Sequence, residues 1–156
     1  MMMRITALVF VLVAAFGSYA QSHTGATGIV KERMDGMKQM GKLHKRVSSM
    51  FKGKTAFERA AVIEAADAFV LHGSGMAKLF PDTEKSRNGH KTEALPEIWQ
   101  DWDDFQSRIA DFVEKSEVLA AAARASADQR ALKKPFSSAV ESCSGCHKRY
   151  RKTKKR

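Results

Sequence analysis

Two cysteines and a histidine stand close together near the carboxyl end of the chain, as Cys143-Ser144-Gly145-Cys146-His147. The sequence contains 2 cysteines in all, so both belong to this run. A Cys-x-x-Cys-His spacing is the attachment signature of a c-type haem. The two thiols add to the porphyrin vinyl groups as thioethers, and the adjacent imidazole can bind iron. The motif therefore predicts one covalently bound haem c, attached through Cys143 and Cys146 and ligated by His147.

Other uses of the cysteine pair predict different surroundings. A thioredoxin-like dithiol has the same spacing, but it lies in a βαβ unit, and the sequence has no convincing strand pattern. A zinc site needs further ligands, and there is no second cysteine pair or closely spaced histidine pair. A disulfide between residues three apart closes too small a loop to stabilise the fold much. Haem attachment is the favoured interpretation, with a redox dithiol, a stray metal site and an inert pair as its alternatives.

The amino-terminal segment has the pattern of an export signal. A start containing one arginine precedes an almost unbroken apolar run over residues 5–16, and Ser18-Tyr19-Ala20 has the small-x-small pattern of a cleavage site. The run is too short for a comfortable membrane span, which favours a signal peptide cleaved after residues 1–20 over an uncleaved anchor. Bacterial c-type haems are attached on the export side of the membrane. Leader and motif together therefore predict a periplasmic protein.

The remaining residues, 21–156, suit one domain with one core. The formal net charge of the full sequence is +10, from 27 Lys and Arg against 17 Asp and Glu. Much of the excess lies in residues 148–156, of which we expect 152–156 to form a basic tail. Such charge favours an acidic redox partner protein or an anionic membrane surface, and export argues against nucleic acid as a partner. A solvated tail without a partner is the simpler alternative.

Apolar residues recur at steps of three and four in four segments, which predicts four amphipathic helices. The expected helices run from about 28 to 51, from 55 to 76, from 96 to 125 and from 128 into the haem motif. The connection over residues 81–95 is polar and aperiodic, and we expect a long crossover loop there. Four such helices with one long connection predict an all-α, antiparallel four-helix bundle, with the haem near one end.

Local signals refine the predicted helix boundaries. Thr55 and Glu58 have the spacing of a capping box at the start of the second helix. Pro96 fits the first turn of the third helix, and Asp128 can cap the fourth. Pro135 either kinks the fourth helix or marks its true start.

With this organisation the chain resembles the cytochrome c prime family, four-helix proteins that carry their haem motif near the end of the last helix. Ordinary c-type cytochromes carry that motif near the amino end. The resemblance covers about residues 30–151. Besides the haem motif, it rests on Tyr150-Arg151, on Leu79-Phe80-Pro81, and on Pro96-Glu97-Ile98-Trp99 with Phe105.

The resemblance implies candidates for the remaining haem contacts. Residues 30–37 resemble the low-spin branch of the family, in which a methionine of the first helix faces the iron opposite the histidine, and Met37 occupies that position. The alternatives are an open, five-coordinate iron with Met37 as core filler, or a second histidine, His44, on the same helix face. Arg33 is implied as a haem propionate contact, since a guanidinium can hold a carboxylate with two donors. Arg151, one turn beyond His147, is a second candidate, and the alternative for each is a solvated surface arginine.

An iron held by imidazole and thioether has no vacant site for a substrate, so the predicted function is one-electron transport. The alternatives are a high-spin protein that binds nitric oxide or carbon monoxide, and a weak peroxidase, for which no distal acid–base residue is evident. No enzyme signature stands out, and Asp101, Asp103 and Asp104 are expected to form a solvated helix face. The resemblance leaves open both a monomer and a homodimer paired through the first two helices.

Overall fold

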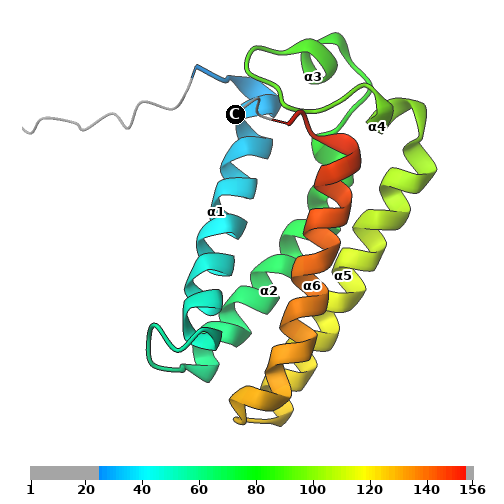
Figure 1. The fold of residues 1–156 in the computed structure, drawn as a ribbon. Coiled ribbons are helices and arrows are strands. Elements are labelled where there is room, and N and C mark those ends of the chain that lie inside the picture. The colour runs from blue at the N-terminus through cyan, green and yellow to red at the C-terminus, as the bar shows by residue number, and fades with distance from the viewer. Residues whose placement is uncertain (1–24, 154–156) are drawn as a thin grey trace, which may run out of the picture.

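In a computed structural model, residues 25–153 form a bundle of four long antiparallel helices (Figure 1). The predicted signal peptide, residues 1–20, and residues 154–156 of the predicted basic tail lie outside this described range. Within residues 25–153, no helix combines the length and apolar character that a membrane span requires. The long helices are α1 (Gly28–Phe51), α2 (Arg59–Met76), α5 (Trp102–Ala125) and α6 (Gln129–Tyr150).

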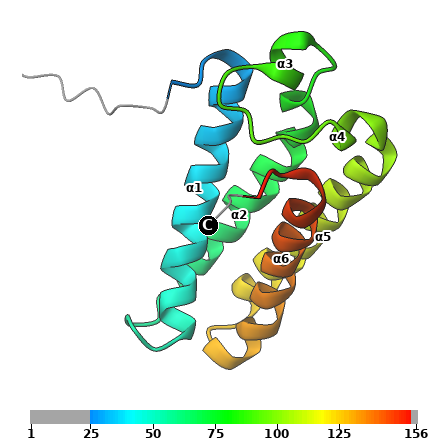
Figure 2. The same cartoon turned by 45° about the horizontal axis from the view of Figure 1, so that its top comes forward.

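The long crossover between α2 and α5 contains three short helical elements. These are the 3-10 turn η1 (Ala77–Leu79), α3 (Glu84–Asn88) and α4 (Glu97–Gln100). The periodicity of the sequence did not predict α3, a five-residue helix that begins after Thr83, whose side chain accepts a hydrogen bond from the Ser86 amide. The crossover lies at the same end of the bundle as the last turns of α6 (Figures 1 and 2). It therefore covers the end that carries the haem motif.

The predicted capping box at the start of the second helix is wrong. Helix α2 begins at Arg59, and residues 55–58 lie in the loop before it. Glu58 is the residue at the N-cap position, but its side chain makes no capping hydrogen bond, and its carboxylate accepts from Arg46 of α1 at 3.0 Å. Phe57 packs against Phe51, with ring centroids 6.0 Å apart. Contacts to α1 thus fix this loop in place of a local cap.

Two prolines have different effects on the later helices. The expected third helix is interrupted at Asp101, whose backbone leaves the helical region. This residue separates α4, which Pro96 precedes, from α5.

Asp128 caps α6 as predicted, with its carboxylate accepting from the Arg130 amide at 2.9 Å. Pro135 lies inside α6, so it does not mark the start of that helix. It removes one amide donor, whose partner in the preceding turn would be the carbonyl of the exposed Ala131.

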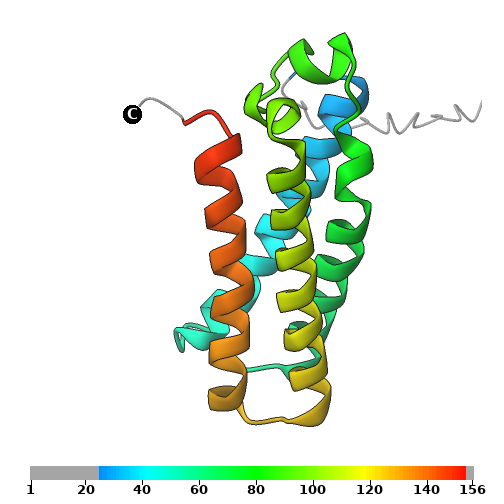
Figure 3. The same ribbon diagram turned by 90° about the vertical axis from the view of Figure 1, so that its right-hand side faces the viewer.

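The core is formed mainly by the contacts of α2 with α5 and of α5 with α6, while α1 packs chiefly on α2. Figure 3 shows α5 and α6 running side by side up to the short loop that joins them. The backbones of α1 and α6 approach each other little, and these helices meet mainly where Phe136 packs against His44 and Phe51. Fully buried side chains in the core include Phe105, Ile98, Leu119, Leu132, Val47 and Val62.

The end of α6 is bound to the crossover by backbone hydrogen bonds. The Leu95 amide donates to the Tyr150 carbonyl at 3.0 Å, and the Lys152 amide donates to the Glu93 carbonyl at 2.8 Å. Ala94 and Arg151 form an antiparallel bridge between these two bonds. We call this contact the crossover clasp. Lys152, predicted as the first residue of a free tail, is therefore part of the fold.

Candidate haem site

Two adjoining cavities lie among the long helices, and the larger of the two is also lined by the crossover. Their volumes are about 400 Å³ and about 320 Å³. Each lies within the range of cofactor pockets, roughly 300–1,000 Å³. Five residues line both cavities, so the two form one continuous region, and these are Met37, Met76, Cys146, His147 and Arg151. The gap that α1 and α6 leave between them is thus lined by the residues predicted to bind haem.

Helix geometry brings the cysteines and the histidine of the motif to one face of α6. Residues at positions i, i+3 and i+4 are neighbours on a helix surface, which is the spacing of Cys143, Cys146 and His147. Both cysteines are free thiols and are half-buried. Burial raises the pKa of Cys143 to about 11 and also raises the pKa of Cys146. A reactive dithiol depends on a lowered thiol pKa, so these surroundings disfavour the redox alternative.

The imidazole of His147 is in a suitable state to bind a metal. Burial lowers its pKa, Arg151 lowers it further, and Glu93 partly opposes the change. A lowered pKa keeps the ring neutral at pH 7, and a neutral imidazole has the lone pair that a metal requires. His147 lines both cavities from α6.

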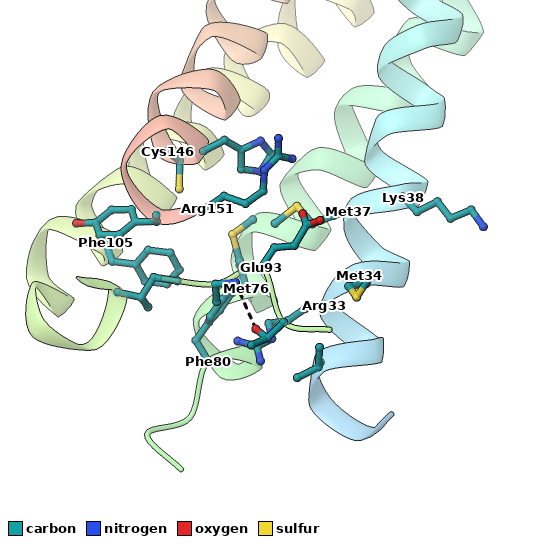
Figure 4. A pocket seen from close by; sticks show the side chains of 16 residues that line it. Arg33, Met34, Met37, Lys38, Met76, Phe80, Glu93, Phe105, Cys146 and Arg151 are labelled. Atoms are coloured by element: carbon teal, nitrogen blue, oxygen red, sulfur yellow. Dashed lines mark hydrogen bonds between the residues drawn. The ribbon is translucent and has the colours of Figure 1, made fainter. Parts of the chain in front are cut away.

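Two methionine side chains reach the cavities from the other helices. Figure 4 shows the sulfur atoms of Met37 on α1 and Met76 on α2 pointing into the cavity, with Cys146 on the facing wall from α6. Lys38, the neighbour of Met37, points away from the site in the same view. In the sequence, Met76 has the spacing of an ordinary core residue of this helix, and nothing there indicates a role in the site. The register between α1 and α2, which brings the two thioethers to one cavity, has no local sequence signal.

Arg33 provides the clearest test of whether the site fits a haem with its propionates. It is only 5% exposed, and its Nη2 donates to the Ser86 carbonyl at 2.6 Å. Its guanidinium lies 4.6 Å from the centre of the Phe80 ring. Its Nη1 is buried without a hydrogen-bond partner among the described residues, although Arg33 lines the larger cavity. A buried cationic donor without a partner at a cavity wall matches the carboxylate that a propionate would supply.

Other predicted residues occupy different positions. Arg151 lines both cavities at the end of α6 but is exposed. His44 lines the smaller cavity and stacks on Phe136, with centroids 5.9 Å apart. The acidic residues Asp101 and Asp104 have partly exposed side chains, as expected of a solvated face, but both also have partners in the protein. Asp101 accepts from Arg149 at 2.6 Å, and Asp104 accepts from Arg108 and Tyr150, so both hold the ends of α5 and α6 together.

A family model described as "Cytochrome C'" matches residues 28–151. The chain belongs to the cytochrome c' family. It is 30% identical over 129 residues to a cytochrome c' of Rhodopseudomonas palustris, covering 82% of this chain and 84% of that protein. It is 29% identical over 136 residues to a cytochrome c-556 of Agrobacterium fabrum, covering 87% and 89%. A solved structure of cytochrome c' from Rhodopseudomonas palustris superimposes with a TM-score of 0.75 at 28% identity, covering 83% of this chain and 99% of that chain.

Membership of the cytochrome c' family confirms the predicted bundle and the predicted cofactor, one covalently bound haem c. The two free cysteines at positions 143 and 146 are consistent with its attachment. The relatives include proteins named cytochrome c' and proteins named cytochrome c-556. The names of these relatives therefore do not decide between a haem iron with two protein ligands and an open, five-coordinate one.

Proposed function

We propose that this member of the cytochrome c' family is a one-electron carrier, with His147 and Met37 as the two axial ligands of its haem iron. The observation that carries the proposal is the shared lining of the site. Met37 from α1 and His147 from α6 line the same two adjoining cavities, in the gap where these helices touch little. Imidazole and thioether ligands would come from two separate walls, as a six-coordinate iron between them requires.

The bound haem would supply the redox centre, an iron that alternates between Fe(II) and Fe(III). The protein's own residues would hold it and tune it. Cys143 and Cys146 would fix its position on α6, and Arg33 would bind a propionate through its unpartnered Nη1. The apolar side chains of Phe80, Phe105 and Ile98 line the larger cavity and would exclude water from the ring. Thioether ligation and a dry pocket both favour the ferrous form.

Absorption spectra of both oxidation states test the assignment of Met37. We expect a low-spin ferric protein with the weak long-wavelength band of methionine bound to Fe(III). Met37→Ala should become high-spin and open to added ligands. Met34→Ala, on the same helix, is the matched control and should leave the spectrum unchanged. A high-spin wild-type spectrum would contradict the proposal and favour the alternative, an open iron that binds nitric oxide or carbon monoxide.

Met76 needs its own variant because its sulfur points into the same cavity. Met76→Leu keeps the volume of the side chain but removes the sulfur. If Met37 is the ligand, this variant should stay low-spin. Loss of the low-spin spectrum in Met76→Leu, with Met37→Ala unchanged, would transfer the ligand role to α2.

The cellular setting is also part of the proposal. The amino-terminal leader and the covalent haem support a periplasmic location with the signal peptide removed after about Ala20. The positive charge supports an acidic redox partner protein or an anionic membrane surface. Size-exclusion chromatography with light scattering would distinguish a monomer from a homodimer.

A further inference from the structure

Charged residues are divided unevenly between the long helices of this protein. Helices α1 and α6 together contain 11 Lys and Arg against 3 Asp and Glu, whereas α2 and α5 contain 4 against 7. The two basic helices are those that leave the gap lined by the candidate haem residues. An uneven charge distribution orients a protein as it approaches a charged partner. The positive side of the molecule is therefore the side of the haem site.

Three lysines of α1 form a stripe along one edge of this gap. Lys38, Lys42 and Lys45 have the spacing of residues on one helix face, and all three are exposed. Figure 4 shows that Lys38 points to the outside, away from the cavity. Each of these lysines directly follows a residue that lines the smaller cavity, and those residues are Met37, Gly41 and His44. We call the three lysines, which thus border the cavity from α1, the lysine stripe.

The facing edge of the gap, on α6, also carries basic residues. Lys148 is exposed and directly follows His147, and Arg151 is exposed and lines both cavities. Ser144 is exposed as well and lines the smaller cavity, so this cavity reaches the surface along α6. Glu93 lines the larger cavity and is not among the residues that line the smaller one. The smaller cavity therefore opens to the surface between basic residues of both helices.

Ion pairs within the protein do not cancel the charge of the lysine stripe. Its three lysines form no ion pair with another residue of the range 25–153, whereas Lys31, two turns before the stripe, pairs with Asp35. Helix α1 contains no acidic residue after Asp35. The proposed propionate contact, Arg33, also precedes the stripe, so the negative charge of that propionate would lie beyond its first residue. The lysine stripe thus remains a row of uncompensated positive charge.

We infer that the lysine stripe, with Lys148 and Arg151 across the gap, is the docking surface for an acidic patch on an electron-transfer partner protein. The inference rests on the electron-carrier proposal and deepens it, because it assigns the face that the partner contacts. A protein docked here would cover the mouth of the haem site, which keeps the path of the electron short. The acidic residues of α2 and α5 would turn the opposite side of the molecule away from the same partner.

An acidic protein fits this surface better than an anionic membrane does. Proteins that lie on a membrane surface usually insert apolar side chains next to their basic residues. Within residues 25–153, the large apolar side chains that are exposed are Leu71 on α2 and Val118 on α5. Neither belongs to the two basic helices, so the charged surface has no apolar anchor beside it.

Isothermal titration calorimetry with a polyglutamate peptide tests the inference on haem-loaded protein without electron transfer. We expect the wild type to bind at low salt. Replacing all three lysines of the stripe by Gln should weaken binding about tenfold, the effect of three lost exposed ion pairs. The matched control replaces Lys54, Lys78 and Lys134 by Gln. These lysines are exposed and neither line nor directly adjoin a cavity-lining residue, so their loss should weaken binding about twofold at most.

Further variants and probes separate the possible outcomes. Arg at the three positions of the stripe should retain binding, because the contact requires charge, and an unchanged Soret spectrum in each variant shows that the haem site is intact. Equal weakening in the stripe variant and the control would overturn the inference, since net charge alone would then explain binding. So would a wild type that binds phosphatidylglycerol vesicles but not polyglutamate, because the partner would be a membrane. A high-spin wild-type spectrum would contradict the electron-carrier proposal but leave the calorimetric result unchanged.

Discussion

Replacing Arg33 by Met in the haem-loaded protein removes a charge that the structure buries at the wall of the larger cavity. The variant keeps a long, flexible side chain in the same place. It loses the hydrogen bond from Nη2 to the Ser86 carbonyl and the contact of the guanidinium with the Phe80 ring. It also loses the Nη1 donor that we assign to a propionate. We therefore expect a clear loss of stability.

The contacts of Arg33 set the size of that loss. A hydrogen bond from a charged donor contributes about 1.5–3 kcal/mol, and a partly desolvated contact of a cation with an aromatic ring about 1 kcal/mol. Removing a buried charge returns part of its desolvation cost, on the order of 1 kcal/mol. The net loss is about 1.5–3 kcal/mol in the free energy of unfolding. For a domain of this size, that lowers Tm by roughly 10 °C.

Thermal unfolding followed by circular dichroism and by Soret absorbance measures this loss. Arg87→Met is the matched control, since Arg87 also lies over an aromatic ring, Trp99, but pairs with the exposed Asp82 outside the cavity. We expect a much smaller change of Tm there. Arg33→Lys keeps the charge without the two-pronged donor and should restore only part of the stability. Equal changes of Tm in Arg33→Met and Arg87→Met would refute the reasoning.

Two further predictions concern charge. Hydrogen bonds from Arg108, and to a smaller extent from Tyr150, lower the pKa of the Asp104 carboxyl. The ionised carboxylate therefore stabilises the fold fully above the unfolded pKa of about 4. That stabilisation is lost as pH falls through the lower pKa of the folded state. Denaturant unfolding between pH 7 and pH 2 should therefore show a flatter acid dependence for Asp104→Asn than for the wild type, and parallel curves would contradict this. Truncation after Thr153 keeps the crossover clasp but removes three basic residues, so the electron-transfer rate with an acidic partner should fall less steeply as salt rises. Equal rates of the truncated and full-length proteins at low salt would mean that the tail is only solvated.

The sequence predicted the bundle and the haem motif well because both depend on local spacing. The helix over residues 28–51 was predicted at its observed bounds, since its apolar stripe is regular. The start of α2 was predicted wrongly because Glu58 prefers an ion pair with Arg46, a partner twelve residues earlier in the chain. Local capping rules cannot anticipate a tertiary partner of this kind.

The part of the candidate site that lies on a single helix was predictable from the sequence. Cys143, Cys146 and His147 share a face of α6, and the motif alone places them together. The contribution of α2 was not predictable, because Met76 and His72 have the same spacing as ordinary core residues. Their place at the cavity depends on how α1 and α2 cross. Gly36 leaves room for the His72 ring at this crossing, but a glycine in the sequence does not by itself predict such a contact.

The separate packing of α1 and α6 has a consequence for the order in which the holoprotein is assembled. The haem motif is on the last helix to be synthesised, and the residues opposite it are on the first. Helix α1 packs chiefly on α2, and its ring contacts with α6 are those of His44 and Phe51 with Phe136, ahead of the haem motif. We therefore expect that a unit of α2, α5 and α6 can present its cysteines while α1 is still undocked. We expect α1 amides to exchange with solvent faster than those of α5 in haem-free protein. Helix α1 would then dock last, after the haem is attached to α6, and its docking would bring Met37 to the haem.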